Sequence, residues 1–421
     1  MNAQLNAKEA RIDTIERMLS TYPLVISISA NIPGIHKKTK EAYVLVSLFS
    51  KQLETRLNPP YLNDHSDDAG CWVLIGVSGR DGLSLKKELM EIEDTHPLGR
   101  LIDLDLFSGS KVSISRLQLG FLERLCLLCS KPASVCRRTA AHDPFLIKTL
   151  IEQRVASYLR LTLDDWIKDA MDQELALEDK FGLVTKTSQG SHTDMNHRLM
   201  EDAANVIRPY LVDLFFLGFN ADDSQSLVEK ARPIALLAES AMFSKTKGVN
   251  CYKGLIFILG YVLLSFGFVL SKHLTYPSLF ETMKHLAKDV LKELEQEGST
   301  AGLRMYRTYG FLGARGEIHH GLQSIRSLYT EVNSNPNQLR NLLKIIVLTT
   351  EDTVFLHRAG SLKRYLDVKA IFRKTDVSDP SQARELTEYC IHNGLSFGGA
   401  ADLLIAAIFL SHVNQTFLKS I

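Results

Sequence analysis

The sequence has almost no excess of charge of either sign, and it has few cysteines. Its 49 Lys and Arg are balanced by 48 Asp and Glu, which leaves a formal net charge of +1. Because no strong positive field surrounds such a molecule, its composition gives no reason to expect nucleic acid as a partner. Six cysteines in 421 residues are too few for a disulfide scaffold, so a reducing, cytoplasmic location is expected.

Long apolar runs are also scarce. The N-terminal residues 1–16 are polar and lack the apolar core of a signal peptide. One run of 18 uncharged residues, Gly254 to Ser271, reaches the lower limit for crossing a bilayer. Gly260, Ser265 and Gly267 interrupt this run, and no comparable partner segment exists. The alternatives are a membrane anchor and the central helix of a helical domain. We favour the buried helix, without membrane association.

The pattern of the chain changes near residue 160. Before it, strand patterns at residues 24–30, 71–77 and 101–107 alternate with helical patterns at residues 39–57 and 83–94. This alternation is typical of an α+β domain.

After residue 147 the strand patterns vanish, and breaks that contain Gly or Pro separate many of the helical patterns that follow. We therefore predict an α+β domain over residues 1–160 and an all-α domain over residues 161–421, with a buried apolar central helix. The predicted helices of the second domain cover residues 164–178, 196–218, 222–243, 255–270, 278–297, 339–350 and 400–410.

Two aspartates in the first domain lie two residues apart in a strand pattern. On a strand, Asp103 and Asp105 would point to the same face, about 6–7 Å apart. Two carboxylates ringed by arginines suit a magnesium ion that holds a phosphate group. The simpler alternative is a solvated edge strand with two surface acids.

Several cations lie near this pair in the sequence. Lys37 follows a turn at residues 31–34, and Arg100, Arg116 and Arg124 flank the aspartates. Taken singly, each cation is a surface charge. Taken together, they resemble a site that neutralises a polyphosphate.

Cysteines and a histidine follow the arginines. Cys126, Cys129, Cys136 and His142 fit four zinc ligands by type and roughly by spacing. The alternative is that the cysteines are core residues of an apolar helix.

These motifs occur in an order that resembles a known family. Residues 31–34 with Lys37, residues 96–100 with the two aspartates, Ser115-Arg116, and residues 124–142 are similar to apo-citrate lyase phosphoribosyl-dephospho-CoA transferase, over about residues 5–150. The resemblance implies a nucleotidyltransferase-type fold. It also implies transfer of phosphoribosyl-dephospho-CoA to a serine of the citrate lyase acyl carrier protein (the gamma subunit), with release of pyrophosphate. Asp103 and Asp105 would hold the metal, and Lys37, Arg100, Arg116 and Arg124 would bind phosphates.

The helical part contains polar residues within apolar sequence. They lie in residues 190–195, 238–239, 247–254, 310–317, 351–358 and 398–402. The segment before the apolar run could cradle phosphates at a helix N-terminus, but it lacks the spacing of a P-loop. Each acid alone is better explained as a helix cap or an ion-pair partner. As a group they suggest a site, because burying unpaired charges is costly.

This part, from about residue 165 to 415, resembles triphosphoribosyl-dephospho-CoA synthase. The resemblance implies that the ribose of ATP is joined to 3′-dephospho-CoA and that adenine is expelled. Oxocarbenium character at the anomeric carbon calls for a nearby carboxylate, and the triphosphate calls for cations. The expected carboxylates are Asp194, Glu239 and Glu317, the expected substrate-binding residues are His192, Lys253, Arg315 and Arg358, and the expected magnesium ligands are Asp352 and Asp402.

The second domain departs from the pattern of the family that it resembles at three places. Cys251-Tyr252 stands where Thr-His is usual, Asp179 and Phe181 stand where prolines are usual, and Phe397 replaces a proline. We expect the lost prolines to loosen the loop and the lost His to remove a base or a phosphate contact. The prediction is a bifunctional enzyme. The alternative is a scaffold for citrate lyase maturation that is non-catalytic or has lost the second activity.

Overall fold

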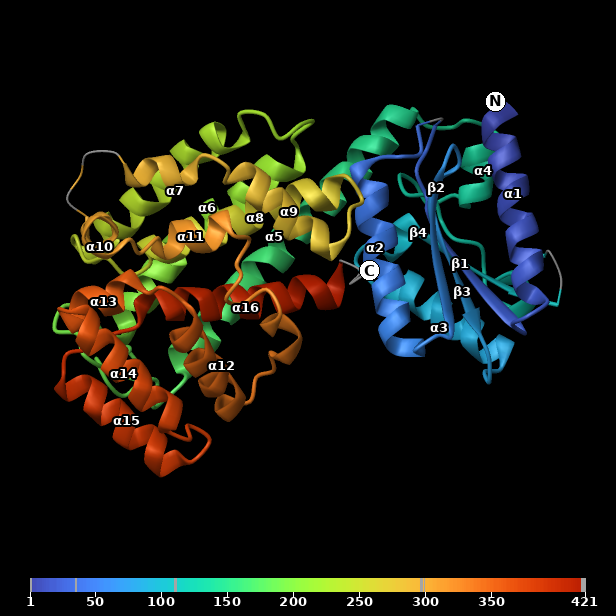
Figure 1. Cartoon of the computed structure of the whole chain (residues 1–421). Coiled ribbons are helices and arrows are strands. Elements are labelled where there is room, and N and C mark those ends of the chain that lie inside the picture. The colour runs from blue at the N-terminus through green and yellow to red at the C-terminus, as the bar shows by residue number, and fades with distance from the viewer. Residues whose placement is uncertain (1, 35, 110–111, 296–297, 299, 418–421) are drawn as a thin grey trace. The chain divides into compact units, whose positions relative to one another are not determined.

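A computed structural model describes residues 2–34, 36–109, 112–295, 298 and 300–417 (Figure 1). The chain divides into two compact units. The first contains most residues up to Leu161, and the second contains most residues from Thr162 onward. Helix α5 (Pro144–Ala176) is continuous across this boundary.

The first unit is built on a four-stranded antiparallel sheet in the order β2-β3-β1-β4. Its strands are β1 (Leu24–Ala30), β2 (Tyr61–Asp67), β3 (Gly70–Val77) and β4 (Ile102–Ser108). The strands predicted at residues 24–30, 71–77 and 101–107 are confirmed. Strand β2 was not predicted, because it is a partly exposed edge strand with five polar residues among its seven and no apolar alternation.

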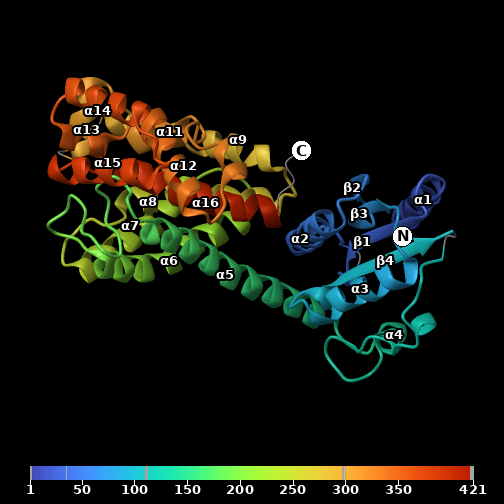
Figure 2. The same cartoon turned by 90° about the horizontal axis from the view of Figure 1, so that it is seen from below.

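One face of the sheet is mostly apolar. Ile26, Ile75 and Leu104 lie on it, and helices α2 (Lys40–Leu57) and α3 (Gly82–Thr95) cover it, with α3 beside β4 (Figure 2). Thr39 caps α2 by accepting from the Ala42 N–H, and Asp81 caps α3 by accepting from the Ser84 N–H. Both helices were predicted within one residue at each end.

The opposite face carries helix α1 (Asn2–Leu19), which was not predicted (Figure 1). Ile15 and Met18 pack on Val25, Trp72 and Phe107. This apolar cluster covers only part of the face, because the same face continues from Phe107 to Asp105 and Asp103. The helix therefore leaves polar groups of the sheet beneath its N-terminal half.

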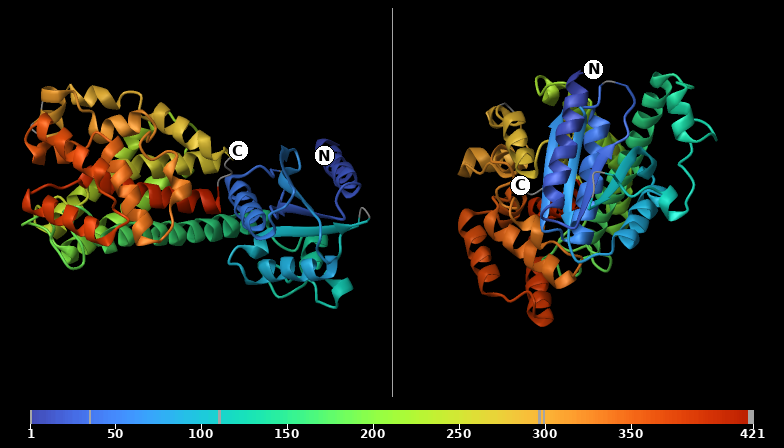
Figure 3. Two further views of the ribbon diagram at one scale, coloured as in Figure 1. Left: turned by 60° about the horizontal axis from the view of Figure 1, so that its bottom comes forward. Right: turned by 90° about the vertical axis from the view of Figure 1, so that its right-hand side faces the viewer.

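The described part of the second unit contains helices and no strand (Figure 3). Its helices are α6 (His197–Phe219), α7 (Leu227–Thr246), α8 (Lys253–Ser271), α9 (Tyr276–Leu286), α10 (Ala301–Tyr309), α11 (Gly313–His319), α12 (Pro336–Thr349), α13 (Thr353–Ala359), α14 (Leu362–Lys374), α15 (Pro380–His392) and α16 (Gly398–Thr416). The all-α prediction is confirmed.

Helix α8 is the predicted apolar helix. It is long and apolar enough to cross a bilayer, but 78% of its apolar window is buried inside the fold. A Cβ at Gly267 would lie 2.1 Å from the Phe215 carbonyl oxygen, and one at Gly218 would lie 2.1 Å from that of Leu264. The glycines therefore let α6 and α8 pack backbone against backbone. The interpretation as a buried helix is confirmed.

Candidate functional sites

The two aspartates of β4 lie on one face of the sheet. Asp103 pairs with Ser29 and Asp105 with Ser27, so both side chains project toward α1. Burial raises the pKa of Asp103, and the neighbouring Arg124 opposes that rise. The expected side-by-side placement of the two carboxylates is confirmed.

Arg11 of α1 lies over the two aspartates, and sequence analysis did not single it out. Its guanidinium donates to Ser27 Oγ and lies 5.2 Å from the centre of the Trp72 ring. Burial lowers the pKa of Arg11, and Asp105 leads the carboxylates that oppose this shift. A cation therefore lies beside the aspartate pair from a helix about 90 residues earlier in the sequence.

Lys37 approaches from the loop before α2. Its ammonium donates to the Ile32 carbonyl at the predicted turn. Burial lowers the pKa of Lys37, while Asp103 acts to raise it. The structure therefore brings Lys37 near Asp103, as expected of a residue of the same site.

Arg124 and Glu93 bind the outer edge of β4. Arg124 Nη1 lies 2.9 Å from Asp103 Oδ1 and 3.1 Å from the Ile102 carbonyl oxygen. Glu93 Oε1 accepts from the Leu104 N–H at 2.8 Å and pairs with Arg124. Lys86 adds a bond of 2.9 Å to the Leu104 carbonyl. Glu93 is thus a buried acid that orients Arg124, and sequence analysis gave it no role.

Arg100 and Arg116 complete a cluster of guanidinium groups with Arg124. Arg116 Nη2 lies 2.6 Å from Asp94 Oδ1, and Arg100 donates to the Leu125 carbonyl. The Nε atoms of Arg100 and Arg116 are buried without a partner among the described residues. Burial lowers the pKa of Arg100, and Arg124 lowers it further. Clustered cations with unused donors suit an anion with several oxygens.

Tight backbone packing holds this edge. A Cβ at Gly99 would lie 2.5 Å from the Glu93 carbonyl oxygen and 2.6 Å from that of Ile92. Only glycine fits this close approach, which directs the chain from α3 into β4. The glycine of residues 96–100 therefore places Arg100 and Asp103 beside Glu93.

The predicted zinc ligands also come together. Cys126, Cys129, Cys136 and His142 each offer a ligand atom, and these atoms lie within 4.8 Å of one another. This group lies on the segment that begins with Arg124 and includes helix α4 (Ala133–Arg138).

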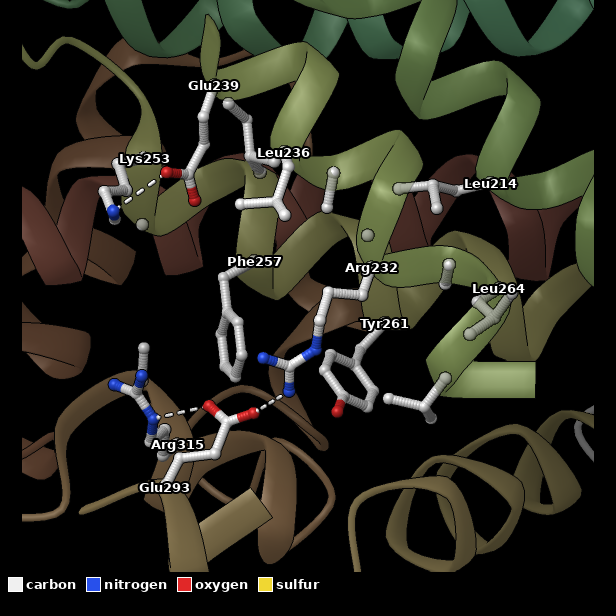
Figure 4. A pocket seen from close by; sticks show the side chains of 17 residues that line it. Leu214, Arg232, Leu236, Glu239, Lys253, Phe257, Tyr261, Leu264, Glu293 and Arg315 are labelled. Atoms are coloured by element: carbon white, nitrogen blue, oxygen red, sulfur yellow. Dashed lines mark hydrogen bonds and ion pairs between the residues drawn. The ribbon is translucent and has the colours of Figure 1, made fainter. Parts of the chain in front are cut away.

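A cavity of about 370 Å³ opens in the second unit between α6, α7, α8, α11 and the 3₁₀-helix η3 (Val290–Leu294) (Figure 4). Most of its lining is apolar, and charged groups lie at two places. Lys253 Nζ lies 2.8 Å from Glu239 Oε2 at one place. At the other, Glu293 Oε2 accepts from Arg315 Nε at 3.1 Å and Glu293 Oε1 pairs with Arg232.

Aromatic rings separate these two charged places (Figure 4). Arg315 lies 5.6 Å from the centre of the Phe257 ring. Burial raises the pKa of Tyr261 to about 12, and Glu293 adds to the rise. Three predicted residues, Glu239, Lys253 and Arg315, therefore share one cavity. Arg232 and Glu293 also line it and were not predicted.

Three other predicted residues form a second group in the same unit. Arg358 Nη2 lies 3.0 Å from His192 Nδ1, and His192 Nε2 lies 2.9 Å from Ser396 Oγ. Asp194 Oδ1 lies 3.8 Å from His192 Nδ1 and is largely exposed. Burial and then Arg358 lower the pKa of His192 to about 4. His192 is therefore neutral near pH 7 and accepts from Arg358 through Nδ1.

Asp352 is a helix cap. Its Oδ1 accepts from the N–H groups of Val354 and Phe355 at 2.8 and 3.0 Å, and its Oδ2 accepts from the Ala400 N–H at 3.0 Å. The carboxylate thus joins the N-termini of α13 and α16. Burial raises the pKa of Asp402, with Asp352 as the next cause. Among the described residues these two do not form a metal-type cluster of three or more ligands, so their magnesium role stays a prediction.

Glu317 belongs to a hydroxyl network. It accepts from Ser324 Oγ at 2.5 Å and from Thr350 Oγ1 at 3.1 Å. It is absent from the cavity lining, although Arg315 lines it. Of the expected carboxylates, Glu239 therefore lies in the cavity, while Glu317 connects the end of α11 to the end of α12.

Comparison with known proteins matches each half of the chain to a protein family. Residues 1–158 match the model of the family apo-citrate lyase phosphoribosyl-dephospho-CoA transferase, and residues 160–420 match that of ATP:dephospho-CoA triphosphoribosyl transferase. "Protein CitXG" of Haemophilus influenzae is 30% identical across 97% of this chain and 95% of its own length. The chain belongs to the CitXG family of fused proteins. It is a bifunctional transferase.

Other relatives agree. "Protein CitXG" of Leuconostoc mesenteroides subsp. cremoris is 27% identical over 97% of this chain and 96% of its own length. The "2-(5''-triphosphoribosyl)-3'-dephosphocoenzyme-A synthase" of Haemophilus ducreyi is 30% identical over 67% of this chain and 98% of its own length. The Haemophilus ducreyi protein resembles only part of this chain, as a separate synthase would.

The structure also shows what occupies the positions where this CitXG member departs from the expected motifs. Asp179 and Phe181 have φ values of 51° and 61°, which a proline ring excludes. Lys180 between them is fully buried and lies 2.7 Å from Glu174 Oε1, and the Phe181 N–H donates to Thr387 Oγ1. These buried contacts hold the loop at the positions where prolines are usual, and its expected loosening stays a prediction. Phe397 is also fully buried, against Phe355 and Phe372.

The Cys251-Tyr252 pair leads into α8. Tyr252 is buried, and its N–H lies 3.2 Å from the Met242 sulfur. Burial and then Asp194 raise the pKa of Cys251 to about 11. Neither side chain replaces the base that a histidine would supply, because neither is ionised near pH 7. A base for the reaction of the helical unit must therefore come from other residues of this CitXG member.

Proposed function

We propose that residues 1–160 and 161–421 each perform one of the two reactions of this enzyme. The chain forms 2′-(5″-triphosphoribosyl)-3′-dephospho-CoA from ATP and 3′-dephospho-CoA and releases adenine. It then transfers the phosphoribosyl-dephospho-CoA group to a serine of the citrate lyase acyl carrier protein and releases pyrophosphate. The helical unit supplies the first step and the α+β unit the second. The observation that carries the proposal is the placement of Asp103 and Asp105 on one face, with Arg11, Lys37 and Arg124 around them.

Asp103 and Asp105 would hold a magnesium ion in the transfer reaction. The residues fit such an ion, because hard cations take carboxylate oxygens together with phosphate oxygens. The ion, when bound, would neutralise charge that develops on the leaving pyrophosphate. This arrangement of a carboxylate pair on a sheet among cations supports a nucleotidyltransferase-type site.

The guanidinium cluster would bind the phosphates of the same substrate. Arg100 and Arg116 each have a buried Nε without an acceptor among the described residues, and Arg124 already contacts Asp103. Phosphate oxygens would satisfy these donors and draw Arg124 and Arg116 from their carboxylates. Arg11 and Lys37 would add positive charge on the α1 side of the aspartates.

The cavity of the helical unit would bind substrate for the first reaction. Its volume of about 370 Å³ lies within the usual range for small-molecule sites. Phe257 and Tyr261 offer apolar surface for a base or ribose, and Lys253, Arg232 and Arg315 offer cations for the triphosphate. Glu239 would stabilise the developing oxocarbenium ion. His192 and Arg358, with Asp194, would bind a further anionic part of the substrates.

The partner and compartment follow from the same activity. The carrier protein receives the group, and nucleotides are the other ligands. The described cysteines are all free thiols, which agrees with a reducing cytoplasm.

Intact mass of the carrier tests the proposal. Purified chain is incubated with apo-carrier, ATP, 3′-dephospho-CoA and magnesium. A mass gain of one phosphoribosyl-dephospho-CoA group, together with adenine release, is expected. A gain only with the preformed triphosphate precursor would leave only the transfer reaction. Adenine release without a gain would leave only the synthase reaction. Asp103→Asn separates enzyme from scaffold, because a scaffold would show no catalytic loss.

A further inference from the structure

The segment between β4 and α5 lacks an apolar core of its own. Among the described residues from 108 to 150, Cys136 alone is buried. Large apolar side chains are exposed instead, including Leu117, Leu122 and Leu125. A segment of this length does not hold one conformation through hydrophobic burial alone, and small modules of this kind are stabilised by disulfides or metals.

The Cys126 group lies at the centre of this segment. The ligand atoms of Cys126, Cys129, Cys136 and His142 are mutually within 4.8 Å. Cys129 Sγ lies 3.4 Å from Cys136 Sγ, and His142 Nε2 lies 3.3 Å from Cys129 Sγ. All three cysteines are free, and 3.4 Å is far longer than the ~2.05 Å of a disulfide bond.

The Cys129–Cys136 and Cys129–His142 separations are close to those in a tetrahedral zinc site. Bonds of about 2.3 Å to sulfur and about 2.0 Å to nitrogen place two sulfurs ~3.8 Å apart and sulfur and nitrogen ~3.5 Å apart. Hydrogen bonding does not explain the convergence, because thiols are weak donors and weak acceptors. Cys126 and Cys129 are also partly exposed, which is unlike cysteines that serve only as core residues.

The local backbone is folded to present the first two cysteines together. Leu125 pairs with Pro132, and the Cys126 N–H donates to the Lys131 carbonyl at 2.7 Å. The Leu128 N–H lies 3.5 Å from Cys126 Sγ. The turn therefore directs a backbone N–H at the sulfur of Cys126.

The same turn contains a residue of the transfer site. Arg124 precedes Cys126 by two positions, its carbonyl accepts from the Ala133 N–H at 2.9 Å, and its side chain contacts Asp103. Arg100 donates to the carbonyl of Leu125. The position of the turn therefore sets the position of Arg124.

We propose that Cys126, Cys129, Cys136 and His142 bind one zinc ion, and that this ion fixes the turn that places Arg124 against Asp103. The three thiols release their protons to solvent on binding, and His142 binds as the neutral imidazole. The metal site stands on its own geometry. The positioning of Arg124 rests on the proposed function.

Metal content tests the site. Full-length protein purified without chelator should contain one zinc per chain by elemental mass spectrometry, and cobalt should substitute for it with the absorption of thiolate-bound tetrahedral Co(II). Cys129→Ser with Cys136→Ser should lose the metal. Cys390→Ala, a buried cysteine of the helical unit, is the matched control and should keep it.

Three results would overturn the site. The first is wild-type protein without metal after purification from zinc-replete cells. The second is full zinc content in the double variant. The third is an intact mass lower by two hydrogens that reduction restores, which would show a disulfide. Chelation and reloading of the wild-type chain give the same answer if the variant does not fold.

A second experiment tests the positioning of Arg124. Removing zinc from the wild-type chain should lower kcat for carrier modification from preformed precursor by roughly 10- to 100-fold, and zinc should restore it. Adenine release in the same sample is the internal control and should stay unchanged. In Arg124→Ala, which lacks the positioned group, zinc removal should cause little further loss.

The outcomes separate the two claims. An equal further loss in Arg124→Ala would overturn the positioning role. Bound zinc together with no carrier modification under any condition would overturn the proposed function and leave the metal site intact.

Discussion

Arg124 Nη1 lies 2.9 Å from Asp103 Oδ1, across 21 positions of sequence. This ion pair joins the aspartate pair of β4 to the arginine cluster in the proposed transfer site. A divalent ion at Asp103 and phosphates at Arg124 would each compete with the pair. Substrate binding should therefore replace the Arg124–Asp103 pair by two contacts, one between Asp103 and the metal ion and one between Arg124 and a phosphate.

Asp103→Asn removes a charge from the aspartate pair while keeping its shape. We expect carrier modification to fall roughly 100- to 1,000-fold, because charge stabilisation at the leaving pyrophosphate is lost. Transfer from preformed precursor to apo-carrier, followed by intact mass, measures it. Adenine release should be unchanged in the same protein. Transfer within twofold of wild type would contradict the assignment.

Glu93→Gln tests the buried acid behind Arg124. Glu93 is 1% exposed and pairs with both Arg124 and Arg116, so its neutralisation leaves partly buried arginines without their carboxylate. The free energy of unfolding should drop by about 3 kcal/mol, as measured by urea titration. Glu88→Gln on the same helix removes pairs with Arg56 and Arg80 at the surface and should cost less than about 1 kcal/mol. Equal losses in both variants would contradict the role given to Glu93.

His192 predicts a pH dependence of stability. Its pKa is about 4 in the folded chain, against about 6.5 when unfolded. Between these values the unfolded chain binds more protons, so stability is retained above pH 6.5 and is lost as the pH falls toward 4. The loss from pH 7 to pH 5 should be about 2 kcal/mol larger in wild type than in His192→Gln. Urea titrations at the two pH values measure it, and identical losses would exclude a buried neutral His192.

Variants of Glu239 and Glu317 test which of these two carboxylates acts in the synthase reaction. Glu239→Gln should reduce adenine release roughly 100-fold, because the charge facing the cavity is lost. Glu317→Gln should instead lower the free energy of unfolding by about 2 kcal/mol, because Ser324 and Thr350 lose a charged acceptor. Adenine release and urea unfolding are measured on both. A larger catalytic loss in Glu317→Gln would reverse the assignment.

Gly267→Ala tests the close packing of α6 and α8. The new Cβ would lie 2.1 Å from the Phe215 carbonyl oxygen, so the helices must separate at a cost of about 3 kcal/mol. Gly302→Ala in α10 meets its nearest neighbour at 4.0 Å and should be neutral or stabilising by up to about 1 kcal/mol. Thermal unfolding measures both. A tolerated Gly267→Ala would mean that α8 is not packed in this way.

Much of the fold could be predicted from local pattern. Strand β4 and helix α8 were recognised from apolar alternation and from a continuous apolar run. Helix α1 was missed because its packed face is a narrow apolar stripe that includes Ile12, Ile15 and Met18. Spacing of three residues along that stripe was the available signal. Strand β2 carried no such signal.

The site residues also divide into those that local sequence pattern indicates and those that it does not. Asp103, Asp105 and the Cys126 group were recognised because their members are close in sequence. Arg11 and Glu293 were missed because folding brings them in from distant segments, and nothing beside them in the chain indicates a ligand. A single sequence does not show which charged residues from distant segments will pair in the fold.

Residues 251–254, which lead into α8 and begin it, have a consequence for how this enzyme can vary. Asp194 helps to raise the pKa of Cys251, and Lys253 pairs with Glu239. A Cβ at Gly254 would lie 2.1 Å from the Asp402 carboxylate. Three acids that are distant in sequence therefore lie near the same four residues. A replacement in this tetrapeptide should be tolerated only alongside compensating changes at positions 194, 239 or 402, so these sites should vary as a set among fused proteins of this kind.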